Sequence, residues 1–230
     1  MNKGRESEET GEKYRFTPVN LSKSDVRRTY ARLSRIYDFW GFLTESKAVG
    51  KAIHLADIKN GERVLEVAVG TGVIFEHIVA ANNNGQNDGI DLSPEMLTRA
   101  ENRLKKHHSN YSLKVADAYS LPYPDATFDV IFNSYMFDLL PEKDFSQVLL
   151  EFKRVLKPGG RIVITSMTMG RKWYSQIWDW LVRKAPNILE GCRPISLLED
   201  VNQMGFQNIR EEYVSQLTFP SLVLYAEKLA

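Results

Sequence analysis

The sequence predicts an α/β protein with a mostly parallel sheet of seven strands, and three observations carry this prediction. Short apolar runs alternate with amphipathic stretches after Gly61, a pattern that is typical of βαβ units. Runs such as VLEVAV and RIVIT are nearly continuous in apolar residues, so helices should cover both faces of the sheet. The last two strand-like segments are joined by a short connection that contains Pro220, which favours a terminal antiparallel hairpin.

Hydrophobic periodicity places the expected elements in order along the chain. A helical cap is expected before the first strand, at residues 24–37 and Glu45–Ala56. The expected strands are Arg63–Val69, Asp88–Asp91, Ser112–Ala116, Phe128–Asn133, Arg161–Met167, Gln207–Val214 and Leu222–Lys228. The helices among them are Val73–Ala81, Pro94–His107, Glu142–Leu156 and Ser196–Met204. The run Lys157–Gly160 should end the third of these helices, because proline stops a helix and glycine permits the turn.

Composition and charge exclude several classes of protein. The chain has 230 residues, of which 30 are basic and 29 acidic, and this balance argues against a nucleic-acid binder. The single cysteine, Cys192, excludes an intramolecular disulfide and fits a reducing compartment. The amino-terminal residues lack the apolar stretch of a secretory signal, and no run reaches about 18 apolar residues. We therefore expect a cytoplasmic protein with no nucleic-acid partner.

The most informative segment is VLEVAVGTG at Val64–Gly72, a strand that enters a glycine-rich turn before a helix. Gly70 and Gly72 remove side chains where a ligand approaches the backbone, and the following helix presents free N–H groups. Asp91 ends the next expected strand 19 residues after Gly72, where an acidic side chain in this topology accepts ribose hydroxyls. Asp117 ends the strand after that and is placed to accept from an adenine amino group. Each carboxylate alone is explained as well by solvation or capping, but together they predict a nucleoside site.

Four motifs in order, VLEVAVGTG, GIDLSPEML, VADAYSLPYPDATFDVIFNS and EFKRVLKPGGRIVI, resemble those of the class I S-adenosylmethionine-dependent methyltransferases. Within that family the chain is most similar to the ubiquinone and menaquinone C-methyltransferases and the small phospholipid N-methyltransferases. The resemblance covers residues 25–230 and implies a Rossmann-like fold, with S-adenosyl-L-methionine (SAM) as cofactor and S-adenosyl-L-homocysteine as product. The acceptor stays open, because these motifs hold the cofactor. An NAD-dependent dehydrogenase is disfavoured, since Phe75 stands where GxGxxG needs its last glycine.

The resemblance also implies a role for each matching residue. The loop around the methionine moiety would comprise Glu66, Ala68, Gly70, Thr71 and Gly72. The ribose and adenine would be held by Asp91, Leu92, Asp117 and Ala118, and the sulfonium end would lie beside Asn133 and Ser134. Ala68 departs from the family's GxGxG, and its methyl group is tolerated if the backbone there has φ below zero. A non-catalytic, cofactor-binding sensor of the same fold is the alternative that this departure leaves open.

Two residues are candidates for chemistry beyond cofactor binding. Methyl transfer from a sulfonium depends chiefly on proximity and orientation, and a carbon or phenol acceptor also needs a general base. Asp138 and Tyr37 are the catalytic candidates. Asp138 would otherwise be a helix-capping or solvated acid, and Tyr37 a packing residue. The histidines form no cluster, so no metal is expected.

The chain divides into an expected tail at residues 1–18, disordered or loosely docked, and one domain at 19–230. Within the domain we expect a helical cap at 19–60, a cofactor-binding core at 61–169, and an acceptor-side segment with the terminal strands at 170–230.

Two segments outside the βαβ core are free to cover the carboxyl edge of the sheet. Residues 22–35 hold five basic side chains and one acidic one, and residues 171–184 hold three tryptophans between basic ends. We therefore expect an apolar pocket with a basic rim that includes Arg193, and a lipophilic or anionic acceptor. A small polar metabolite is the alternative. The tryptophan-rich segment would otherwise pack on the sheet or at a dimer contact, so monomer, homodimer and peripheral membrane contact all stay open.

Overall fold

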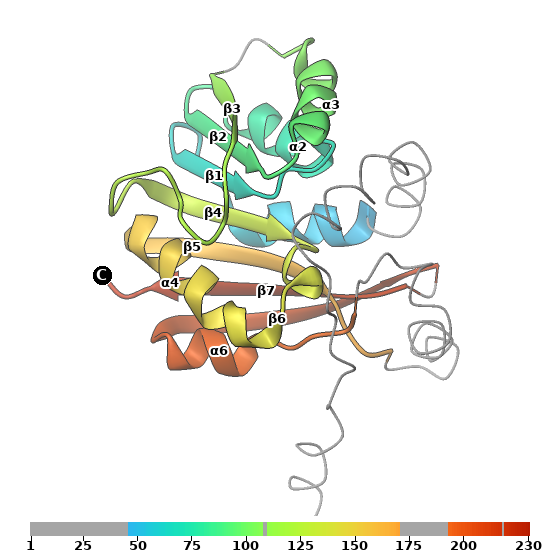
Figure 1. Cartoon of the computed structure of the whole chain (residues 1–230), viewed down its shortest axis with the longest axis vertical. Helices are drawn as coiled ribbons and strands as arrows, with labels where there is room; N and C mark the ends of the chain where they lie inside the picture. The colour runs from blue at the N-terminus through green and yellow to red at the C-terminus, as the bar shows by residue number, and fades with distance from the viewer. Residues whose placement is uncertain (1–45, 108–109, 171–192, 218) are drawn as a thin grey trace, which may run out of the picture.

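The structure is a computed structural model that describes residues 46–107, 110–170, 193–217 and 219–230. One seven-stranded sheet runs through the molecule (Figure 1). The strands are β1 (Arg63–Val67), β2 (Gln86–Asp91), β3 (Tyr111–Val115), β4 (Phe128–Ser134), β5 (Leu156–Met167), β6 (Phe206–Gln216) and β7 (Phe219–Lys228). The helices are the segment 46–56, α2 (Val73–Ala81), α3 (Pro94–Leu104), α4 (Phe145–Val155) and α6 (Leu198–Gln203), with 3-10 turns η1 (Phe137–Leu139) and η2 (Glu142–Asp144).

The strand order is β3-β2-β1-β4-β5-β7-β6, and this confirms the predicted fold class. β1 to β5 are parallel, whereas β7 pairs antiparallel with both β5 and β6. The chain leaves β1 for β2 on one side and later returns to β4 on the other, so the order reverses between β1 and β4. In open sheets of this kind a ligand binds at the carboxyl edge beside such a reversal.

Helices cover both faces of the sheet, as the continuous apolar runs predict. One core lies under α4 and α6 and includes Leu65, Ile131, Phe152 and Val201. The other lies under the helix at 46–56, α2 and α3, and includes Ala52, Phe75, Leu104, Phe132 and Val163. In Figure 1 the first pair of helices is drawn in front of the lower strands and α2 and α3 lie beside the upper strands. The carboxyl edge between the two layers is therefore left for the loops.

The predicted order of elements is confirmed, and several ends differ. α2 has the predicted bounds, because Gly72 starts it in a left-handed conformation and the chain leaves the helix at Asn82. α3 ends at Leu104, three residues before its predicted end. The predicted tail and first cap helix, and the tryptophan-rich segment, lie outside the described residues.

The helix predicted at Glu142–Leu156 begins as the 3-10 turn η2, and α4 starts at Phe145. It ends at Val155, before the Lys157–Gly160 run that was predicted to stop it. β5 already includes both glycines of that run, at a register shift against β4, and Gly159 has φ of 73°. The glycines therefore form an irregular strand start rather than a separate turn.

The amino-terminal edge of the parallel strands contains buried polar side chains with partners. Asn82 is fully buried, and its Oδ1 accepts the Gly61 N–H at 2.8 Å. Its Nδ2 donates to the Glu62 carbonyl and to Asn87 Oδ1, both at 2.9 Å. Asn87 donates in turn to two backbone carbonyls. Arg161 makes a bidentate pair with Glu62 at 2.8 and 2.7 Å and donates to carbonyls at the end of the helix at 46–56, which ties this helix to the sheet.

Candidate active site

The loop between β1 and α2 lies at the carboxyl edge, beside the reversal of strand order. Three of its residues have left-handed backbones, Ala68 with φ of 63°, Gly70 with 56° and Gly72 with 83°. The Val69 N–H donates to the Ile90 carbonyl at 3.0 Å, which ties the loop to β2. The backbone therefore turns sharply past the strand ends before α2 begins.

The two glycines of this loop serve different purposes. A Cβ added at Gly70 would meet nothing within 4 Å, so this position opens onto free space, as ligand approach requires. A Cβ added at Gly72 would lie 2.9 Å from the Cβ of Ala100 in α3. Glycine is therefore needed at position 72 for the close packing of the start of α2 against α3, in addition to the predicted need for ligand approach.

Ala68 does not meet the condition under which its methyl group was expected to be tolerated. The expectation requires φ below zero, but φ is 63°. The left-handed conformation costs an L-residue with a Cβ about 1–2 kcal/mol. The loop thus keeps the shape that a glycine at this position would favour and holds a strained alanine instead.

Asp91 lies at the end of β2, directly against the loop. Its Oδ2 accepts the Gly70 N–H at 2.8 Å and its Oδ1 accepts the Ser93 N–H at 2.9 Å. Burial raises the pKa of Asp91, and the backbone N–H groups of Ser93, Gly70 and Leu92 oppose this rise. Each carboxylate oxygen has a second lone-pair direction, so Asp91 keeps the capacity to accept hydrogen bonds from hydroxyl groups.

Glu66 on β1 is 2% exposed, and its Oε2 has no hydrogen-bond partner in the described part of the chain. Burial raises the pKa of Glu66 well above its usual value, and the charge of Asp91 adds to the rise. A buried carboxyl oxygen without a partner is costly, and such groups collect at functional sites. Glu66 therefore has an open acceptor atom near the end of β1.

The end of β4 brings two further predicted residues beside β1. Asn133 is the register partner of Val67 and donates from Nδ2 to the Val67 carbonyl at 2.9 Å. Its Oδ1 and the Oγ of Ser134 are buried and have no hydrogen-bond partner among the described residues. The predicted methionine and sulfonium residues therefore do come together.

The predicted adenine residues follow the ends of the two neighbouring strands. Leu92 follows β2 and is partly buried. Asp117 follows β3, accepts the Tyr119 N–H at 3.1 Å and pairs with Ser120 as an isolated bridge. Ala118 packs against the core under α4. The Ala116 N–H donates to the Asp91 carbonyl at 3.1 Å, so the segment after β3 is tied to the end of β2 at this edge.

Asp138 lies in η1 and is 0% exposed. Its Oδ2 accepts the Met167 N–H at 2.8 Å, so it joins the turn after β4 to the end of β5. The alternative of a solvated acid is therefore wrong. Its role as a base stays a prediction, and Tyr37 lies outside the described residues.

Arg193 was expected at the rim of an acceptor pocket, and this expectation is wrong. The residue is 5% exposed, and its Nη1 donates to Glu142 Oε1 while its Nη2 donates to the Leu140 carbonyl, both at 2.7 Å. Its guanidinium also lies 6.0 Å from the Phe145 ring centroid. These contacts hold the guanidinium away from an exposed rim, and its buried Nε has no hydrogen-bond partner among the described residues.

Sequence reasoning missed two residues at this edge. Thr165 on β5 is 2% exposed and its Oγ1 has no hydrogen-bond partner in the described structure. Tyr135 has φ of 54° and donates its N–H to the Thr165 carbonyl at 2.8 Å. Neither leaves a signal in the sequence, because Thr165 lies within an apolar strand run and a left-handed tyrosine has no motif.

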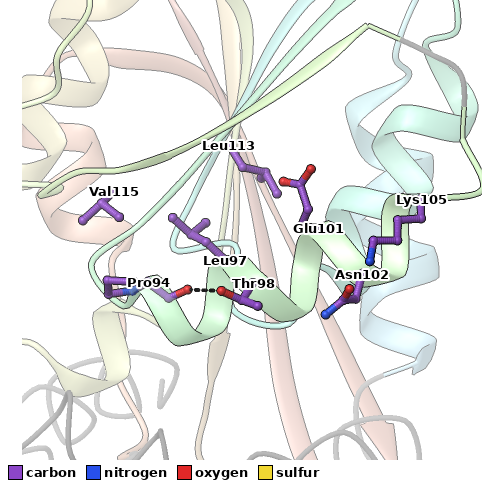
Figure 2. A pocket seen from close by; sticks show the side chains of 8 residues that line it. All are labelled: Pro94, Leu97, Thr98, Glu101, Asn102, Lys105, Leu113 and Val115. Carbon is purple, nitrogen blue, oxygen red and sulfur yellow. Dashed lines mark hydrogen bonds between the residues drawn. The ribbon is translucent and has the colours of Figure 1, made fainter.

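A separate hollow of about 400 Å³ lies between α3 and β3. Figure 2 shows Leu113 and Val115 of β3 on one side of it and Leu97, Glu101, Asn102 and Lys105 along α3. None of the predicted cofactor residues lines it. It is therefore distinct from the carboxyl-edge site.

Fold and site together define an α/β protein with a candidate ligand site at the carboxyl edge of its sheet. Residues 64–160 match the family described as a methyltransferase domain. A phosphatidylethanolamine N-methyltransferase of Cereibacter sphaeroides is 37% identical over 147 residues, which cover 61% of this chain and 67% of the relative. The ubiquinone/menaquinone biosynthesis C-methyltransferase UbiE of Bordetella avium is 31% identical over 187 residues, which cover 76% and 72%. The chain therefore belongs to the class I SAM-dependent methyltransferases.

Solved structures agree on the fold. The [4+2]-cyclase SpnF has a TM-score of 0.72 at 19% identity, covering 93% of this chain and 98% of that one. A phosphoethanolamine N-methyltransferase 2 of Haemonchus contortus, with phosphomonomethylethanolamine and S-adenosylhomocysteine, has a TM-score of 0.70 at 19% identity, covering 93% and 62%. A cyclase and a methyltransferase thus share this architecture, so the fold alone does not fix the reaction.

The residues at the carboxyl edge fit SAM, the cofactor of this family. Gly70 opens onto free space, Asp91 keeps acceptor capacity for hydroxyls, and Glu66 holds an unpartnered buried oxygen toward the same edge. Within the described residues, no helix is both long enough and apolar enough to cross a membrane.

Proposed function

We propose that this methyltransferase acts on a small lipophilic or anionic acceptor bound over the carboxyl ends of β4 and β5. The observation that carries the proposal is an apolar cluster of Tyr135, Met167 and Phe219 at this end of β5. The cluster begins directly after Ser134, which is expected beside the sulfonium, so an acceptor that reaches the methyl group meets an apolar wall. Relatives named for phosphatidylethanolamine and demethylmenaquinone support a lipid-like acceptor.

Bound SAM supplies an electrophilic methyl group on a sulfonium centre. In this proposal Asp91 accepts the ribose hydroxyls, the Gly70 backbone lies against the methionine part, and Glu66 Oε2 meets a cationic group of the cofactor. These contacts fix the orientation of the methyl group toward the ends of β4 and β5. Fixed orientation supplies most of the acceleration in a displacement with a good leaving group.

Asp138 would take the proton of a carbon or phenol acceptor. It is buried in the turn that follows the acceptor end of β4, and a carboxylate within hydrogen-bond reach of the acceptor can serve as a general base. Asp138→Asn keeps an acceptor for the Met167 N–H but cannot act as a base, whereas Asp138→Ala loses both functions. If Asp138 is the base, the Asp138→Asn variant should keep wild-type stability and wild-type cofactor affinity. Its turnover should fall by roughly 10²-fold or more. Wild-type turnover of the Asn variant together with a destabilised Ala variant would leave it a structural residue.

The acceptor class is tested with a radiolabelled methyl donor and three sets of probes. Quinols and phosphatidylethanolamine in vesicles represent the lipophilic and headgroup acceptors, and small polar amines represent the alternative. We expect turnover with the first two sets to exceed turnover with the small amines. The reverse preference would contradict a lipid-like acceptor.

Peripheral contact with membranes also belongs to this proposal. The basic and tryptophan-rich segments expected to carry it lie outside the described residues. Vesicles that contain anionic lipid should bind the protein at low salt and release it as salt screens the charges. Equal binding to neutral and anionic vesicles would remove the electrostatic part.

A further inference from the structure

Thr165 and Ser134 form a pair of hydroxyl groups at the carboxyl ends of β5 and β4, adjacent strands in Figure 1. They are direct partners in the parallel register. Thr165 is 2% exposed, and the Oγ1 of Thr165 and the Oγ of Ser134 are both buried without a hydrogen-bond partner in the described part of the chain. Buried polar groups nearly always have a partner, so two such hydroxyls side by side require an explanation.

Both hydroxyls lie on the face of the sheet that also carries Glu66. Register partners point to the same side of a sheet and alternate residues return to it. Glu66 is the partner of Phe132, two residues before Ser134. Thr165 is the partner of Val223, which belongs to the core on that face. Unpartnered oxygens of Glu66, Ser134 and Thr165 therefore follow one another across β1, β4 and β5, away from the cofactor loop.

The pair has apolar neighbours, and the backbone of the adjacent Tyr135 is strained. Val223 is the register partner of Thr165, and Met167 is the next residue on the same face. Tyr135 donates its N–H to the Thr165 carbonyl, and its hydroxyl hydrogen-bonds Ser221 Oγ at 2.8 Å. Its left-handed φ of 54° is unfavourable for a bulky residue, and such strain collects at functional sites.

We propose that Thr165, together with Ser134, hydrogen-bonds an uncharged oxygen atom of the methyl acceptor and positions the acceptor against the methyl group. This inference rests on the proposed function and narrows it. Two hydroxyls can each donate to one carbonyl or hydroxyl oxygen. A buried ammonium or phosphate would need a countercharge. The register partner Val223 is apolar, and the one carboxyl in the row, Glu66, is assigned to the cofactor in the proposed function. The acceptor is therefore a molecule with a neutral oxygen close to the atom that is methylated.

Thr165→Val tests the inference, because valine keeps the shape and removes the hydroxyl. Loss of an unpaired buried hydroxyl should leave the Tm of the ligand-free protein unchanged or raise it by about 2–4 °C. Calorimetry should show unchanged SAM affinity. With a 1,4-naphthoquinol probe, kcat/KM should fall about tenfold, chiefly through a higher KM.

Thr127→Val is the matched control. The Thr127 hydroxyl donates to the Pro124 carbonyl at 2.7 Å, at a loop before β4, so the same change there should lower the Tm and leave kcat/KM intact. A fall in Tm for Thr165→Val like that of the control would reveal a structural partner and overturn the inference. A stable Thr165→Val variant with wild-type kcat/KM would overturn it as well.

Failure of the proposed function has a separate signature. If the wild-type protein methylates none of the lipid-like probes, the acceptor class is wrong. The Tm values of the two valine variants still show whether the Thr165 hydroxyl lacks a partner. A lower Tm for Thr165→Val contradicts an unpaired hydroxyl, and a higher Tm supports one.

Discussion

At the amino-terminal edge of the parallel strands, Asn82 and Asn87 are fully buried and bond to each other and to backbone groups. At the carboxyl edge, Glu66 and Thr165 are buried to the same degree, yet each keeps an oxygen without a partner among the described residues. Burial alone therefore does not distinguish the two edges. The two asparagines that support the fold find their partners within the fold, whereas an open oxygen costs stability unless a ligand completes its hydrogen bonds.

The largest expected effect is on cofactor binding at the carboxyl edge. Asp91→Ala should weaken SAM affinity about 100-fold or more, since two charge-assisted hydrogen bonds worth roughly 1.5–3 kcal/mol each are lost. Calorimetry measures this directly. Asp125→Ala, at an exposed site before β4 where Arg154 is its partner, is the control and should bind SAM normally. Unchanged affinity in Asp91→Ala would remove the ribose assignment.

At the amino edge the expected effect is on stability alone. Asn82→Ala removes three side-chain hydrogen bonds and leaves Asn87 short of a partner, so the protein should lose about 3 kcal/mol of stability. Thermal unfolding reports this loss, while the SAM affinity of the folded variant should stay within about twofold. Asn84→Ala, at an exposed neighbour, should unfold like the wild type. Weak SAM binding by the folded Asn82→Ala variant would contradict the prediction that the amino-terminal edge contributes to stability alone.

Because of Glu66, the stability of the folded protein should depend on pH. Its pKa in the folded protein lies well above the usual carboxyl value of 4.5, so the folded state binds the proton more tightly than the unfolded state. Stability should therefore fall as the pH rises from 4.5 through the raised pKa. Glu66→Gln, which cannot ionise, should lack this fall and be more stable than the wild type at the higher pH values. Parallel Tm curves for the two proteins between pH 4 and 8 would contradict the prediction.

Ala68 carries the smallest of these effects. Ala68→Gly should relieve the left-handed strain and stabilise the ligand-free protein by about 1 kcal/mol or less, because glycine's larger chain entropy offsets part of the gain. The Tm should rise by about 2–4 °C at most. SAM affinity should tighten if the methyl group crowds the loop, and equal affinity would show that the departure from the family pattern is harmless. A lower Tm would contradict a strained Ala68.

Patterned segments of this chain could be predicted closely from the sequence. α2 has the predicted bounds because a glycine and an asparagine define both of its ends, and the strands of the parallel sheet follow their apolar runs. The start of α4 was missed, since Glu142–Asp144 contains no apolar residue whose spacing could distinguish a 3-10 turn from the first turn of a helix. Similarly, Arg193 shows the charge of a rim residue in the sequence, and only its contacts with Glu142 and Leu140 reveal that the side chain is buried.

The sequence by itself determined the class of fold and the position of Asp91 and Gly70, because strand periodicity and loop glycines are local properties. The cofactor followed from the resemblance of four motifs to a known family. Tertiary structure decided which buried polar groups have partners, since a partner is usually distant along the chain. It placed Ser134 beside Thr165, 31 residues apart, through the register of β4 on β5. It also imposed a left-handed backbone on Ala68, because the loop must pass from β1 to α2 between fixed neighbours whatever residue stands there.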